Sequence, residues 1–131
     1  TGAGAAVAKA IPALEGKLTS NAIRVPVPNG SLAILNLQLH TKVTTEQVNS
    51  LMKKYALEGD LVEQIKYSLD NELVSSDIVG VTAPSIFDSK ATITDNETIV
   101  IYVWYDNEYG YSHQVIRLAK HIAKVRRFTY Y

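Results

Sequence analysis

Two stretches of the chain carry the clearest strand patterns. In residues 31–40, SLAILNLQLH, apolar and polar side chains alternate, which is the period-two pattern of a strand with one buried face. Residues 98–105, TIVIYVWY, are strand-forming almost throughout and predict a buried strand. The Asp-Asn-Glu sequence at 95–97 predicts a hairpin turn that leads into this second strand.

Four further strands are predicted from shorter patterns. Residues 21–27, NAIRVPV, indicate a short strand that stops at the Pro-Asn-Gly turn that follows. The less regular region after residue 60 offers short strand candidates near 72–79, 84–88 and 90–94.

Two helices are expected in the first half of the chain. Residues 1–14 have apolar side chains at helical spacing, with Thr1 as a candidate N-cap. Thr44 and Gln47 have the spacing of a capping box, which predicts a second helix that ends at Gly59.

A third helix is predicted near the C-terminus, with Ser112 as its N-cap. Strands joined by turns, with helices set among them, favour an α+β domain on a mostly antiparallel sheet with about three helices. The apolar stripe of the last helix comprises Val115, Ile116, Leu118, Ala119, Ile122 and Val125.

Length, charge and cysteine content bound the domain size and exclude several kinds of site. A chain of 131 residues is long enough for one domain with a real core. Acidic and basic residues balance at 13 each, so no global field attracts nucleic acid, and we expect no nucleic-acid partner. The chain has no cysteine, which excludes a disulfide framework, a thiolate zinc site and a cysteine nucleophile within it.

No apolar run approaches the length of a membrane span, and no signal peptide is visible, so the sequence predicts a cytoplasmic protein without membrane contact. The first residue is Thr1 rather than Met, and we therefore expect the chain to be a piece of a longer protein. The three histidines, His40, His113 and His121, lack the spacing of metal ligands, and no metal site is expected.

Two positions have residues suited to anion binding. Thr1 and Gly2 stand at a helix start, where free N–H groups and the helix dipole favour a bound phosphate; simple N-capping is the alternative. Arg24 interrupts an apolar stretch, where a charge is costly unless it is paired or bound to an anion. A solvent-facing arginine on an edge strand would explain Arg24 equally well.

A third candidate is the turn within VWYDNEYGYS, residues 103–112. Asn107 offers both a donor and an acceptor, which suits a primary amide ligand, and Tyr111 offers a flat apolar face. Gly110 permits a sharp turn or a positive φ. The alternative is a well-capped turn without a ligand.

Three long motifs resemble one known family. They are TGAGAAVAKAIPALEGKLTSNAIRVPVPNGS (1–31), LVSSDIVG with SIFDS (73–89) and WYDNEYGYSHQVIRLAKHIA (104–123). Together they resemble the C-terminal half of the catalytic domain of phosphorylating glyceraldehyde-3-phosphate dehydrogenase. The resemblance implies that residues 1–131 form the C-terminal part of that domain. The NAD-binding domain and the segment with the catalytic cysteine and histidine would then be absent, and the isolated fragment inactive.

The resemblance also implies roles for individual residues. Thr1 and Gly2 match the family's Thr-Gly pair that binds inorganic phosphate, and Arg24 matches the arginine that contacts the substrate's phosphate. Asn107 matches the asparagine that holds the nicotinamide carboxamide, and Tyr111 matches the tyrosine beside that ring. The implied cofactor is NAD, bound mainly by the missing N-terminal domain, and the implied substrates are glyceraldehyde 3-phosphate and inorganic phosphate. No catalytic residue is expected within this chain.

The chain departs from the family pattern in three places. Val-Thr-Ala-Pro at 81–84 replaces an Asn/Asp-Pro-His-Ser-like stretch, Pro-Asn-Gly-Ser at 28–31 replaces the usual Asn-Val-Ser, and residues 41–72 match poorly. These departures leave erythrose-4-phosphate dehydrogenase open as an alternative enzyme. The resemblance also implies that the choice between NAD and NADP is set mainly in the missing domain.

A non-catalytic binding or assembly domain is the alternative from another class. The absent cysteine and the basic, aromatic end of the chain, residues 125–131, are the features that favour it. Family resemblance instead implies a homotetramer that acts in glycolysis. The oligomeric state of the fragment alone, and whether it folds independently, remain open at this point.

Overall fold

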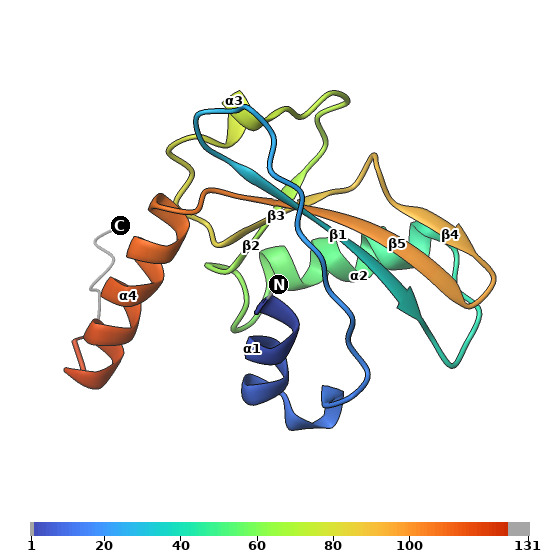
Figure 1. Cartoon of the computed structure of the whole chain (residues 1–131), viewed down its shortest axis with the longest axis horizontal. Helices are drawn as coiled ribbons and strands as arrows, with labels where there is room; N and C mark the ends of the chain where they lie inside the picture. The colour runs from blue at the N-terminus through green and yellow to red at the C-terminus, as the bar shows by residue number, and fades with distance from the viewer. Residues whose placement is uncertain (1, 126–131) are drawn as a thin grey trace.

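The computed structural model describes residues 2–125 of the chain (Figure 1). Its elements, in chain order, are α1 (Ala3–Ala10), the 3₁₀ turn η1 (Pro12–Leu14), β1 (Ser31–Gln38), α2 (Thr45–Leu57), β2 (Ile65–Ser68), α3 (Ser75–Ile78), β3 (Ser85–Asp88), β4 (Ile93–Asp95), β5 (Thr98–Tyr105) and α4 (Tyr109–Ile122).

The five strands form one sheet in the order β1-β5-β3-β2, with β4 also paired to β5. All three neighbours of β5 run antiparallel to it, and only β2 and β3 are parallel. The predicted α+β class with a mostly antiparallel sheet is therefore confirmed, with four α-helices among the described residues instead of about three. The strand predicted at 98–105 has the predicted bounds, and its apolar side chains suit its central place in the sheet.

The hydrophobic core lies between the sheet and α2. Phe87, Ile99 and Ile101 are buried at its centre, and the rings of Tyr67 and Phe87 are tilted with their centroids 5.7 Å apart. The predicted capping box is present, since Thr44 Oγ1 accepts the Gln47 N–H and the Gln47 side chain accepts the Thr44 N–H. The partly buried residues around this core are Leu37, Leu39, Val43, Val48, Met52, Ile65, Tyr67 and Val103.

Two predicted strands are wrong. Residues 21–27 form an exposed, irregular segment, because Pro26 lacks an N–H group and the edge strand β1 pairs only with β5. Residues 72–79 instead contain the short helix α3, where the Asp77 carboxylate accepts the Val74 N–H at 3.0 Å. Local side-chain hydrogen bonds of this kind favour a helix start over a strand.

The remaining short strands fit the predictions better. The candidate at 84–88 is β3, and the candidate at 90–94 overlaps β4, which ends at Asp95. The hairpin between β4 and β5 is confirmed, with Asn96 at a φ of 54° in its turn. β2 was not predicted; it is four residues long and pairs in parallel with β3.

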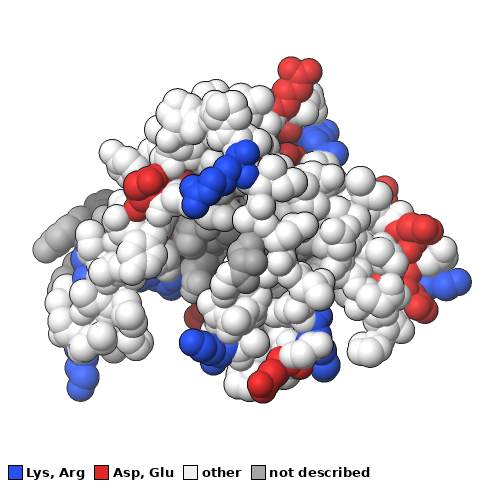
Figure 2. Space-filling view, viewed as in Figure 1, with Lys and Arg blue, Asp and Glu red and all other residues white. Residues whose placement is uncertain are grey.

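Helix α4 extends away from the sheet (Figure 1). The helix itself was predicted, but its apolar stripe is exposed: Ile116 is 53% exposed, Leu118 59% and Ile122 70%. No helix among residues 2–125 is long and apolar enough to cross a membrane. Figure 2 shows charged side chains scattered over one face of the molecule, with uncharged residues covering most of it.

Candidate functional site

The junction of β5 and α4, residues 106–110, includes the first two residues of α4 and is organised by one buried carboxylate; we call it the Asp106 turn. Asp106 is 1% exposed. Its Oδ1 accepts the backbone N–H groups of Glu108 and Tyr109, both at 2.8 Å. Its Oδ2 accepts the Gly80 N–H and the Asn29 side-chain amide, both at 2.9 Å. One side chain thereby joins three segments that are far apart in the sequence.

The hydrogen bonds to Asp106 also decide its charge state. Burial raises the pKa of Asp106, but the donated hydrogen bonds from Gly80, Tyr109, Asn29 and Glu108 outweigh it and lower the pKa to about 2. The carboxylate is therefore ionised at neutral pH, and in that state it accepts all four donors.

The predicted cap of the last helix, Ser112, is wrong. The Ser112 N–H already donates to the Glu108 carbonyl at 3.0 Å within the helix. Asp106 has both features of an N-cap, because its carboxylate accepts two N–H groups of the first turn and its carbonyl accepts the Gly110 N–H at 3.1 Å. An aspartate directly after a strand was the signal that could have identified this cap from the sequence.

Asn107 is exposed, and the Oδ1 atom of its side-chain amide is hydrogen-bonded. Ser31 Oγ donates to Asn107 Oδ1 at 2.5 Å. Ser31 opens β1 and lies opposite Tyr105 in the β1–β5 ladder, so the two strands bring it to the Asp106 turn. Asn107 Nδ2 donates to no other residue in the described part of the chain, which leaves its two hydrogens available to a ligand.

Gly110 differs from its prediction. It is buried and helical, and it is not among the glycines with positive φ. A Cβ at this position would lie 3.4 Å from the Ala83 carbonyl oxygen and from Pro84 Cα. Gly110 therefore permits a close approach of α4 to that loop, while the neighbouring Tyr111 remains 72% exposed.

The N-terminal candidates lie at the start of α1. Thr1, predicted as cap and phosphate ligand, lies outside the described residues. Gly2 occupies the N-cap position without a side-chain cap, and its carbonyl accepts the Ala6 N–H at 3.0 Å. The Gly4 N–H donates to Ser20 Oγ at 3.3 Å, so a hydroxyl from the following segment meets the first turn of α1.

Residues 20–31, which we call the anchored segment, connect the first turn of α1 to the Asp106 turn. At one end Ser20 contacts the first turn of α1; at the other, Asn29 and Ser31 bond to the Asp106 turn. Arg24 lies between these anchors, is exposed, and forms no ion pair with any residue of 2–125. Figure 1 shows this stretch running past α1 to the top of the sheet. The anchored segment, on which Arg24 lies, thus links the first turn of α1 to the Asp106 turn.

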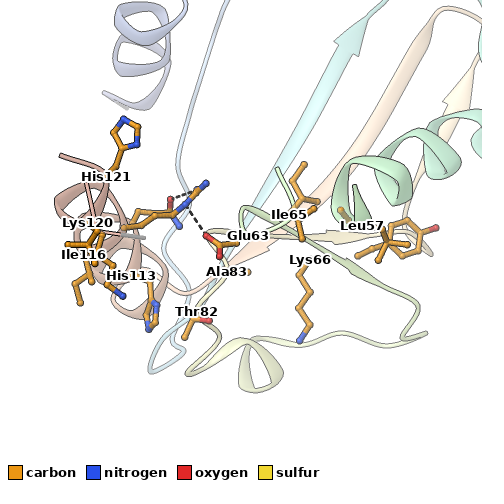
Figure 3. Close-up of a pocket in the computed structure, with 16 residues that line it drawn as sticks. Leu57, Glu63, Ile65, Lys66, Thr82, Ala83, His113, Ile116, Lys120 and His121 are labelled. Atoms are coloured by element: carbon orange, nitrogen blue, oxygen red, sulfur yellow. Dashed lines mark hydrogen bonds and ion pairs between the residues drawn. The ribbon is translucent and has the colours of Figure 1, made fainter. Parts of the chain in front are cut away.

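A large groove lies elsewhere. It has a volume of about 1150 Å³ and separates α4 from β2 and the end of α2 (Figure 3). Arg117 on α4 reaches across it to Glu63, with Nε 3.2 Å from Oε2. His113 and His121 line the groove, but no three His, Cys, Asp or Glu side chains in residues 2–125 are grouped to hold a metal ion. Gly2, Arg24, Asn107 and Tyr111 do not line it; they lie at the start of α1, on the anchored segment and at the start of α4.

Comparisons with known proteins agree on one family. The family model described as "Glyceraldehyde 3-phosphate dehydrogenase, C-terminal domain" matches residues 1–107. A glyceraldehyde-3-phosphate dehydrogenase-like protein of Pseudomonas aeruginosa is 50% identical over 125 residues, which are 95% of this chain and 27% of that protein. Glyceraldehyde-3-phosphate dehydrogenase of Schistosoma mansoni is 48% identical over 126 residues, 95% of this chain and 37% of the relative.

Glyceraldehyde-3-phosphate dehydrogenase A of Escherichia coli is 45% identical over 125 residues, again 95% of this chain and 37% of the relative. The chain therefore spans between 27% and 37% of the length of these relatives. The matched family model ends at residue 107, just before α4 begins.

Proposed function

The chain belongs to the glyceraldehyde-3-phosphate dehydrogenase family, and we propose that it forms the C-terminal part of the catalytic domain of an NAD-dependent, phosphorylating enzyme. That enzyme oxidises a phosphorylated aldehyde, best represented by glyceraldehyde 3-phosphate, to an acyl phosphate. The catalytic cysteine and histidine and most of the NAD site come from the rest of the polypeptide, so the chain alone is inactive. The complete enzyme acts as a cytoplasmic homotetramer in glycolysis.

The observation that carries this proposal is the anchored segment. It holds Arg24, an exposed guanidinium without an ion-pair partner in residues 2–125, between the start of α1 and the Asp106 turn. A planar guanidinium binds phosphate through two parallel hydrogen bonds. Gly2 at the start of α1, together with Thr1 before it in the sequence, is the proposed second anion position, for inorganic phosphate.

Asn107 and Tyr111 fit the nicotinamide end of NAD. The free Nδ2 of Asn107 can donate to the carbonyl oxygen of a carboxamide, and Tyr111 exposes an apolar face one helical turn away. When bound, NAD supplies the hydride acceptor. The residues of this chain orient the ring and bind the phosphates, which lowers the barrier by positioning and electrostatics.

The proposal is tested in a chimera, in which this chain replaces the matching segment of the E. coli enzyme. We expect NADH formation that requires both glyceraldehyde 3-phosphate and inorganic phosphate. Equal rates without inorganic phosphate would rule out the phosphorylating assignment. A higher kcat/KM with erythrose 4-phosphate would reassign the preferred aldehyde.

Arg24→Ala tests the substrate-phosphate role in the same chimera. We expect kcat/KM for glyceraldehyde 3-phosphate to fall about tenfold to a hundredfold, the size expected for a lost hydrogen-bonded charge contact. Arg117→Ala is the matched control, because Arg117 pairs with Glu63 across the groove. If the two variants lose the same activity, Arg24 has no special role in substrate binding.

A further inference from the structure

Ser31 contacts Asn107, the proposed nicotinamide-binding residue, and is not itself a proposed ligand contact. We propose that Ser31 is a positioning residue, which turns the Asn107 amide so that its Nδ2 donates to the carbonyl oxygen of the cofactor's carboxamide. The inference rests on the function proposed above, and it assigns a role to a residue that the sequence did not single out.

The backbone holds Ser31 in place independently of any ligand. It is the first residue of β1 and lies opposite Tyr105, two residues before Asn107. The β1–β5 ladder continues from this pair for eight residues on each strand. Asn29, two residues earlier, donates to Asp106 at 2.9 Å and ties the same strand end to the same turn. The hydroxyl is therefore presented to Asn107 by two rigid elements.

The hydrogen bond between Ser31 and Asn107 affects the orientation of the Asn107 amide. The terminal torsion of an asparagine is broad and roughly two-fold, so a free Asn107 would exchange its oxygen and nitrogen positions. A serine hydroxyl can donate to Oδ1 or accept from Nδ2. The separation of 2.5 Å between Ser31 Oγ and Oδ1 lies within the range of O–H···O bonds and below that of N–H···O bonds, so it favours the orientation in which Oδ1 accepts. In that orientation Nδ2 is the group left for a ligand, and a carbonyl oxygen is its complement. Preorganisation of this kind lowers the entropy lost on binding.

A purely structural role predicts something different. At the opposite end of the same ladder, Thr98 Oγ1 donates to Gln38 Oε1 at 3.0 Å, also between exposed side chains. If Ser31 only closes its end of the ladder, its removal should resemble removal of Thr98. Thr98→Ala is therefore the matched control.

The experiment measures the Kd of NAD for the chimera and its variants by fluorescence quenching. We expect Ser31→Ala to weaken NAD binding about two- to tenfold, the range of one lost hydrogen bond. Ser31→Thr, which keeps the hydroxyl, should restore binding to within about twofold, and Thr98→Ala should leave it unchanged. In an Asn107→Ala background, Ser31→Ala should cause no further loss, because it acts only through that amide.

A cofactor analogue separates positioning from general damage. 3-Aminopyridine adenine dinucleotide lacks the carboxamide carbonyl, so Ser31→Ala should not change its Kd. An equal loss with this analogue, or a further loss in the Asn107→Ala background, would overturn the inference. If Asn107→Ala weakens NAD binding while Ser31→Ala does not, only the role of Ser31 fails. If Asn107→Ala has no effect on NAD, the proposed cofactor role of Asn107 fails as well.

Discussion

Helices α2 and α4 have similar lengths and amphipathic sequences, yet the structure treats them differently. Helix α2 is capped by its own residues, Thr44 and Gln47, and packs Val48 and Met52 against the core. Helix α4 is capped by Asp106, whose carboxylate also binds Asn29 and Gly80, and its apolar stripe is exposed. Helix α2 is held by packing, whereas α4 is held at its N-terminal end by a polar network.

The two helices differ in what holds them in place. A helix that completes the core needs a buried face, and α2 has one. Asn107 lies in the turn that Asp106 fixes, directly before α4, and Tyr111 lies in the first turn of that helix. The apolar stripe of α4 is exposed, and exposed apolar patches commonly mark interaction surfaces.

The largest expected effect comes from removing a side chain that packs α2. Met52→Ala should lower the free energy of unfolding by about 2 kcal/mol, the low end of the range for such truncations, because Met52 is only partly buried. Leu118→Ala on α4 is the matched control and should cost less than about 0.5 kcal/mol. Urea unfolding of the chain followed by circular dichroism compares them. Equal losses would mean that α4 is also held by packing.

A smaller effect is expected at the local cap of α2. Thr44→Ala removes the hydroxyl that accepts the Gln47 N–H, and should lower the free energy of unfolding by about 1 kcal/mol. Thr44→Ser keeps the acceptor and should lose only a few tenths of that. The same urea titration measures both variants. A loss from Thr44→Ser as large as that from Thr44→Ala would show that the methyl group, and not the cap, is responsible.

The last prediction concerns acidification. It should have no effect near neutral pH, where Asp106 is ionised. Because the folded pKa of Asp106 is lowered from 3.8 to about 2, its contribution to stability is complete above about pH 4 and is lost as the pH falls towards 2. The start of α4 should loosen over this range. Amide hydrogen exchange at Glu108 and Tyr109, which donate to Asp106, measures it.

The control for acidification is Asp106→Asn. Its exchange rates at these two amides, corrected for intrinsic pH dependence, should not change between pH 4 and pH 2. The backbone amides of the β1–β5 ladder, which bond to backbone carbonyls, serve as the internal reference. Loosening of the ladder and of the start of α4 to the same extent would indicate global acid unfolding instead of loss of the Asp106 network.

The candidate site stays a prediction from residue types, to which the structure adds positions. Arg24, Asn107 and Tyr111 were identified from the sequence, but Arg24 lies on an irregular segment and not on a strand. Ser31 and Asn29 were missed, because their partners are 76 and 77 residues away in the chain. No role was predicted for Asp106 from the sequence, because no local pattern reveals that Gly80 and Asn29 donate to it.

The sequence by itself determined the elements whose signals are local. Strands β1 and β5, the β4–β5 hairpin and the capping box of α2 follow from side-chain alternation and short-range hydrogen bonds within a few residues. The motifs also determined the family. Only the tertiary structure decided that β5 lies between β1 and β3, that residues 20–31 join α1 to the Asp106 turn, and that α4 starts at a buried carboxylate. These features depend on contacts between distant segments, whose partners become neighbours only when the sheet forms.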